Sequence, residues 1–256
     1  MQQIDAAHAA GFGGVGLRLN PLLPTDPVIA GNPQAQQDIE AALARTGLQV
    51  IEVGVFPLTA SINVEALAPV LAFSHKIGAR FLTCPVEDTD MFRRIENFIR
   101  LCELAETCGL DALIEFNPYS ACPDLEAAVN IVTASGRSNA KLLIDALHLS
   151  RSGGKPSDLM TIDPDLVALV HLCDAPPPPQ GNRSQDELRK ESRTARMYPG
   201  EGALWLAELL DVISPSVPLS IEAPSAAHAH LPAGERARLA FEATRSLLRR
   251  LGWPAA

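Results

Sequence analysis

Short apolar runs alternate with helical patterns along the chain. The runs are rich in leucine and β-branched residues and mostly lack polar alternation, which is typical of parallel strands covered on both faces. Seven strands are predicted, at 14–19, 50–56, 80–86, 111–116, 141–146, 166–174 and 217–224.

Helical patterns fill the intervals between these strands. Asn32 and Asn63 are candidate N-caps, and Gly47 and Gly78 are candidate C-terminal stops. Helices are predicted at 32–47, 63–78 and 91–109, and near 124–135, 203–213 and 234–251. Repeated βα units of this kind predict an α/β fold of the (β/α)8 TIM-barrel type, with residues 1–256 as one domain.

The strand count leaves one position of an eight-stranded barrel empty. The chain opens with the helix-like stretch QQIDAAHAA, so the first strand of the barrel is expected to be missing or replaced. A doubly wound sheet is the rival fold, and GFGGVG at 11–16 superficially matches its glycine-rich phosphate loop. Gly11 ends a helix and Gly14 opens a strand, which is the wrong order for that loop.

The longest break in the pattern runs from Ala175 to Gly202. It follows a predicted strand and therefore leaves from the carboxyl-end face, where TIM barrels place their active sites. DELRKESRTAR within it predicts a short helix, and a connection this long favours an active-site lid over a disordered tether.

Composition excludes several function classes. The net charge of -9 disfavours nucleic-acid binding. Five cysteines without a CxxC pair indicate free thiols in a reducing cytoplasm. No long apolar run predicts a membrane span, and the N-terminal stretch does not have the pattern of a signal peptide.

Polar residues occur where four successive late strands end. Glu115, Asp145, His171 and Glu222 occupy these positions, and parallel strands bring their carboxyl ends to one face. Taken singly, each has an ordinary explanation as a cap, an ion-pair partner or a core histidine. Together they make a mixed oxygen and nitrogen set that suits a divalent metal ion.

Other polar residues have weaker assignments. His148 is a candidate substrate or metal-supporting residue, with a surface histidine as the alternative, and Asp174 is expected to orient His171 or bind a substrate hydroxyl. Strand alternation leaves the facing of Glu52 open. His228 and His230 could form a metal pair, but an exposed loop is favoured.

The motifs LIEFNP, LLIDALHLSRSGG, LVHLCDAP, YPGEGALW and PLSIEAP resemble the xylose isomerase-like TIM-barrel superfamily of sugar isomerases, epimerases and endonuclease IV-like proteins. The resemblance extends over about residues 10 to 250 and is most specific in the second half. It implies one divalent ion (Mn²⁺ favoured; Mg²⁺, Co²⁺ or Zn²⁺ as alternatives) held by Glu115, Asp145, His171 and Glu222, with the two glutamates moving the substrate proton. The early strand ends lack the histidines of the endonuclease branch.

The resemblance also implies a substrate-facing arginine before the PGEG turn, here Arg193 or Arg196. Both lie in a polar segment and are expected to act on a substrate carboxylate or phosphate, not on the fold. The expected partner is a small carbohydrate or keto-acid, and a homo-oligomer is possible. A dehydratase of a cyclic keto-acid or keto-polyol, of the 3-dehydroshikimate or inosose type, is the alternative activity, and an inactive ligand-binding barrel is the third hypothesis.

Overall fold

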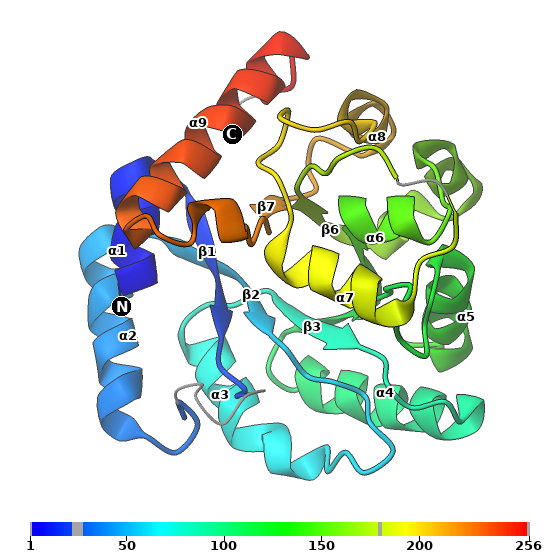
Figure 1. Cartoon of the computed structure of the whole chain (residues 1–256). Helices are drawn as coiled ribbons and strands as arrows, with labels where there is room; N and C mark the ends of the chain where they lie inside the picture. Colours follow the sequence, from blue (N-terminus) through cyan, green and yellow to red (C-terminus); the bar gives the residue numbers. More distant parts are fainter. Residues whose placement is uncertain (1, 22–27, 179–180, 255–256) are drawn as a thin grey trace.

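A computed structural model describes residues 2–21, 28–178 and 181–254. Seven parallel strands in sequence order form a nearly closed barrel with helices around it (Figure 1). The strands are β1 (Gly14–Arg18), β2 (Gln49–Gly54), β3 (Phe81–Pro85), β4 (Asp111–Glu115), β5 (Ala140–Asp145), β6 (Val167–Leu172) and β7 (Leu219–Ile221). All seven predicted strands are therefore present, each within a few residues of its expected bounds.

Longer helices follow most strands. They are α1 (Gln2–Ala10), α2 (Pro33–Thr46), α3 (Ala68–Lys76), α4 (Met91–Glu106), α5 (Leu125–Ser135), α6 (Ala146–Arg151), α7 (Gln185–Thr194), α8 (Leu206–Val212) and α9 (Ala233–Arg250). Short 3-10 helices are η1 (Glu65–Leu67), η2 (Pro156–Thr161), η3 (Pro164–Leu166) and η4 (Ala226–His228). The Asn32 side chain caps α2 by accepting from the Ala35 amide, and Gly47 ends that helix at a φ of 71°. In the described part of the chain, no helix is both long and apolar enough to cross a membrane.

The segment predicted as one helix at 63–78 is divided. Asn63 does accept a bond from the Ala66 amide at 3.2 Å, but the first helical turn after it is the 3-10 helix η1, whose N-cap is Val64. The α-helical part begins only at Ala68, with a proline in its first turn. Proline has no amide hydrogen and is tolerated only in the first turn of an α-helix, which explains the later start.

The first described element is a helix, and no strand precedes β1 among the described residues. β1 and β7 are consequently the two edges of the sheet. On this side of the barrel α1 packs against α9 (Figure 1), and the rings of Phe12 and Phe241 meet edge to face with centroids 5.0 Å apart. The two terminal helices thus cover the side on which the expected strand is missing.

An apolar floor lies on the inner face of the sheet. Phe81, Leu113, Leu143 and Leu169, one from each of β3 to β6, form a buried cluster separate from the main core. Side chains two positions apart along a strand point to the same face. The residues two positions beyond these four are Thr83, Glu115, Asp145 and His171. A polar layer therefore lies directly above an apolar one, toward the carboxyl ends of the strands.

Two phenylalanines on α4 provide a matched test of the packing. Phe98 is fully buried, whereas Phe92 on the same helix is 80% exposed. We expect Phe98→Ala to lower the free energy of unfolding by about 3–5 kcal/mol, because it leaves a cavity in the core. Phe92→Ala should change it by no more than about 0.5 kcal/mol. Urea denaturation of both variants measures the difference, and equal effects would contradict the placement of α4.

Candidate metal centre

Glu115, Asp145, His171 and Glu222 come together at the carboxyl ends of β4 to β7. One possible ligand atom from each lies within 4.8 Å of those of the others. Strand register produces this arrangement, because Glu115 pairs with Leu143, Asp145 pairs with His171, and His171 pairs with Ser220, two residues before Glu222. Glu115, Asp145 and His171 are buried, while the Glu222 side chain is 43% exposed. The cluster is therefore open to ligands from the Glu222 side.

The two ring nitrogens of His171 have different surroundings. Nε2 lies 2.9 Å from both carboxylate oxygens of Glu52. Nδ1 is buried without a hydrogen-bond partner, 3.9 Å from a Glu115 oxygen and 3.5 Å from a Glu222 oxygen. A buried polar atom with no partner is costly, so its position calls for an explanation. A divalent ion between Nδ1 and the carboxylates would supply the missing partner, and the residues present fit such an ion.

The carboxylates have very different pKa values when no metal balances their charge. Burial and the neighbouring Glu222 carboxylate raise the pKa of Glu115 to about 8. Burial also acts to raise the pKa of Glu222, but the positive charge of Arg196 and the nearby His171 ring lower it far below its usual value. Three carboxylates thus crowd together with Arg196 and His171, and the repulsion between them favours binding of a cation.

Arg196 lies against the four-residue cluster and is not a surface residue of the lid. It is 2% exposed and donates to Asp145 at 2.5 Å, and it lies 3.0 Å from Glu222. The expected surface position in the polar segment is therefore wrong, while a role of Arg196 toward substrate stays a prediction. Its position comes from backbone pairing that the sequence does not reveal: Met197 pairs with Asp174, and Ala195 pairs with Ser225.

Arg193 and Arg196 have separate environments. Arg193 lies on the exposed side of α7, outside the cluster. Arg196 instead contacts three buried side chains: Asp145, His148 and Cys173. Of the two candidate arginines, only Arg196 therefore lies at the four-residue cluster.

His148 lies beside the cluster as an uncharged ring. Its Nε2 is 3.4 Å from Arg196, and its backbone amide donates to Asp145 at 2.8 Å, which makes Asp145 the N-cap of α6. Burial lowers the pKa of His148 to about 4. The Tyr119 ring packs edge to face on it, with centroids 5.6 Å apart. His148 can thus accept a hydrogen bond from Arg196 or from a ligand.

Asp174 has a different set of partners from the one expected. Its carboxylate accepts bonds from the amides of Ala175, Gly200 and Leu204 at 2.9–3.0 Å. A Cβ added at Gly202 would lie 2.4 Å from the same carboxylate, so glycine is needed there. Through these contacts the Asp174 carboxylate stabilises the turn that follows Tyr198. Sequence spacing could not show this, because all the donors except Ala175 are distant along the chain.

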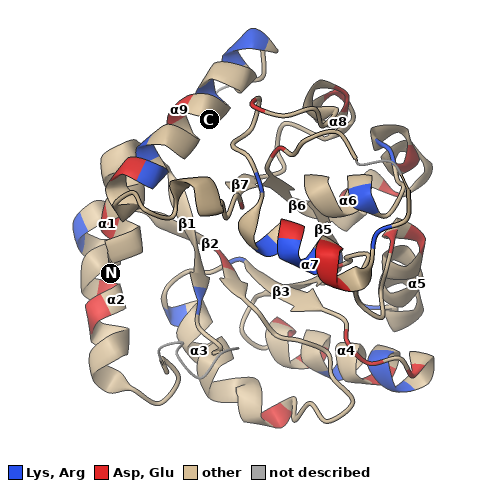
Figure 2. Cartoon of the chain, viewed as in Figure 1, with Lys and Arg blue, Asp and Glu red and all other residues tan. Residues whose placement is uncertain are grey.

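The predicted lid contains α7, which packs over helix α6 and the loop that follows β4. Glu191 of α7 binds Arg151 at 2.9 Å and also binds Arg183. The Tyr119 hydroxyl lies 2.8 Å from the Ser192 hydroxyl. Charged residues of both signs are interspersed along α7 (Figure 2). Residues 179–180 of the predicted lid lie outside the described residues.

Glu52 is the site residue whose role the sequence left open. It is 7% exposed on the inner side of β2, and it contacts both His171 and Ser220. A bulge between Val15 and Gly16 shifts the register of β1 against β2, so simple alternation could not settle its facing. The signal available in the sequence was the lone carboxylate within the apolar run VIEVGV.

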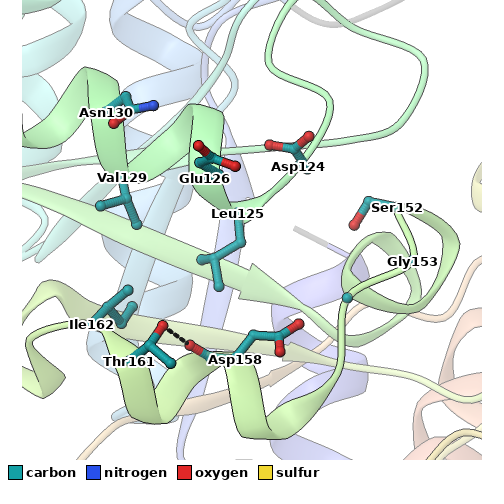
Figure 3. A pocket seen from close by; sticks show the side chains of 11 residues that line it. Asp124, Leu125, Glu126, Val129, Asn130, Ser152, Gly153, Asp158, Thr161 and Ile162 are labelled. Carbon is teal, nitrogen blue, oxygen red and sulfur yellow. Dashed lines mark hydrogen bonds between the residues drawn. The ribbon is translucent and has the colours of Figure 1, made fainter.

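Two other features lie apart from the cluster. His228 stacks on Tyr198 with ring centroids 4.6 Å apart, and His230 is exposed. A hollow of about 480 Å³ between the start of α5 and η2 is lined by apolar and polar residues, three of them acidic (Figure 3). Asp124 there caps α5, and Asp158 accepts from the Lys155 amide. Since their oxygens already bind backbone amides, the hollow does not resemble a second metal site.

The burial of Arg196 generates a prediction with Arg193 as its control. Arg196→Ala leaves the buried Asp145 carboxylate without its cation and should lower the free energy of unfolding by about 3–5 kcal/mol. Arg193→Ala should change it by no more than about 0.5 kcal/mol. Denaturation in a metal chelator measures both variants. An unaffected Arg196→Ala protein would show that the ion pair with Asp145 contributes nothing to stability.

Known proteins show the same architecture. An inosose isomerase from Halalkalibacterium halodurans is 29% identical over 115 residues, which cover 44% of this chain and 38% of that protein. The chain thus matches well under half of this curated relative's length. Two solved structures share the fold over nearly the whole chain. An IolI protein with a bound zinc atom superposes with a TM-score of 0.78 and 16% identity, over 99% of this chain and 94% of that one. A D-psicose 3-epimerase with D-tagatose from Clostridium cellulolyticum H10 gives a TM-score of 0.70 and 14% identity, over 96% of this chain and 92% of that one.

A family model described as a xylose isomerase-like TIM barrel matches residues 4–253. That span contains all seven strands and the four residues of the cluster. The chain therefore belongs to the xylose isomerase-like TIM barrel family.

Proposed function

We propose that this chain is a divalent-metal-dependent isomerase or epimerase that acts on a small keto-polyol or sugar through an enolate. The observation that carries the proposal is the convergence of Glu115, Asp145, His171 and Glu222 around the unpartnered Nδ1 of His171. A divalent ion held there would act as a Lewis acid toward a substrate carbonyl and its neighbouring hydroxyl. The likeness to an inosose isomerase supports a cyclic keto-polyol as the substrate class.

The protein's own groups would perform the proton transfers. A carbon next to a carbonyl is weakly acidic, so its proton must be removed by a base close to it and returned by an acid. Glu222 is the accessible carboxylate of the cluster, so it is placed to remove the proton. Glu115 comes from β4, well separated around the barrel from β7, so it can approach the substrate from the other side and return the proton.

The surrounding residues would orient the substrate and limit its contact with water. Arg196 and His148 offer a donor and an acceptor beside the cluster, and the apolar side chains of Phe81, Leu113, Leu143 and Leu169 lie beneath it. We propose that α7 is the lid, anchored through Glu191 and Ser192. Exclusion of water favours an enolate, because water would protonate it at random.

Metal loading is the first test. After reconstitution with Mn²⁺ and desalting, elemental analysis should give about one equivalent per chain, as expected for a single open site. His171→Ala and Asp145→Asn should lose this ion, because each removes a ligand. His230→Ala, which changes an exposed histidine, is the matched control. Unchanged loading in the two ligand variants would refute the assignment.

Solvent exchange tests the chemistry. With inosose or D-psicose in D₂O, the wild-type protein should introduce deuterium next to the carbonyl, as followed by ¹H NMR. Glu222→Gln should abolish exchange because an amide cannot accept the proton, while Glu208→Gln on the exposed side of α8 should leave exchange intact.

Metal content is measured in the same samples, so that loss of the ion is distinguished from loss of the base. Full exchange in Glu222→Gln would refute the two-carboxylate mechanism. A product with new ultraviolet absorbance would instead identify the dehydratase outcome, in which the same enolate eliminates water.

A further inference from the structure

Glu52 is a buried carboxylate that the proposed proton transfers do not use. It lies one layer below the ligands, with its side chain 10% exposed, and its ion-pair partner is His171. Both carboxylate oxygens are 2.9 Å from Nε2, and the Ser220 hydroxyl donates to one of them at 2.9 Å. Burying a carboxylate is costly unless it is paired and hydrogen-bonded, so this arrangement must be compensated by its partners.

The neighbouring strand is shaped to accept this carboxylate. A Cβ built at Gly16 on β1 would lie 2.8 Å from a Glu52 oxygen and 2.9 Å from its Cγ. Real side chains do not approach this closely, so any residue other than glycine would displace Glu52. Gly16 pairs with Glu52 across the β1–β2 ladder, and Ser220 comes from β7. The carboxylate thus reaches across the side of the barrel where β1 and β7 do not pair.

We propose that Glu52 is a positioning residue: it holds the Nε2–H of His171 and so directs the Nδ1 lone pair at the metal. This inference rests on the proposed metal site. A histidine that donates from one ring nitrogen to a carboxylate has its tautomer and ring orientation fixed, and its other nitrogen becomes a better ligand. Gly16 provides the space for the carboxylate, and Ser220 orients it. Glu52 itself does not touch the ion or the substrate.

Metal affinity in graded variants tests this role. Mn²⁺ binding is followed by the electron paramagnetic resonance signal of the free ion. Glu52→Leu, which keeps the bulk but removes the acceptor, should weaken binding by about 10–100-fold. Glu52→Gln retains one acceptor for Nε2–H, so its Mn²⁺ affinity should lie between those of Glu52→Leu and the wild type. Asp88→Asn is the matched control, since Asp88 is also buried but pairs with Arg93 and touches none of the four ligands.

A second pair of variants moves Glu52 without replacing it. Gly16→Ala should displace the carboxylate and weaken Mn²⁺ binding in the same direction as Glu52→Leu. Gly13→Ala, where an added Cβ meets nothing within 4 Å, should bind as wild type does. Thermal unfolding of the metal-free proteins identifies any variant that is simply unfolded.

Nuclear magnetic resonance gives a readout that general destabilisation would not produce. In the Zn²⁺-loaded wild type, the Nε2–H of His171 should appear as a slowly exchanging downfield resonance, and it should be lost in Glu52→Leu. Wild-type affinity in Glu52→Leu, with this resonance intact, would overturn the inference and leave the metal site standing. Absence of Mn²⁺ binding by the wild type would overturn the proposed function together with the inference.

Discussion

The gathering of three carboxylates and one imidazole within 4.8 Å is the constraint on which the rest of the site depends. Like charges at this separation in a buried setting repel strongly, and the fold responds by protonating one group and pairing others. Burial and repulsion hold Glu115 at a pKa of about 8, and Arg196 sits against Asp145 and Glu222. A divalent ion is the remaining means of balancing the cluster. The same negative charge that would bind a metal thus explains why an arginine is buried within the barrel.

Local sequence patterns predicted the fold and the four clustered residues. Side chains alternate along a strand with a period of two residues, and an N-cap bonds an amide three residues further on. Both patterns are local, so the strands, the Asn32 cap and the polar strand ends could be predicted from the sequence. The roles that could not be predicted depend on contacts between distant segments. Arg196 is buried because its segment pairs with residues near Asp174 and Ser225, and Asp174 is engaged by amides of the turn after Tyr198. Neither arrangement leaves a periodic pattern in the sequence.

The long connection after β6 has two physically different parts. Met197 pairs with Asp174, which follows β6, and Ala195 pairs with Ser225, which follows β7. Backbone hydrogen bonds on both sides therefore fix Arg196. The preceding helix α7 is attached through side chains, including Glu191 to Arg151 and Ser192 to Tyr119. Glu191 and Ser192 are buried, but they leave α7 without the backbone pairing that holds residues 195–197, and contacts of side chains alone are more easily exchanged. A substrate-controlled movement would therefore involve α7 and leave the arginine in place.

The unpaired edges of β1 and β7 have a consequence for how the protein folds. Because α1 packs against α9, this side of the barrel is completed by elements from opposite ends of the described sequence. Contacts of such long sequence separation are entropically costly to form and slow to appear. Glu222 follows β7, and Ser220, which orients Glu52, lies within it. Glu222, the proposed ligand from the C-terminal side, and the Ser220 hydrogen bond to Glu52 therefore both depend on the placement of β7. A bound metal ion would then stabilise the barrel in which this last strand is in place.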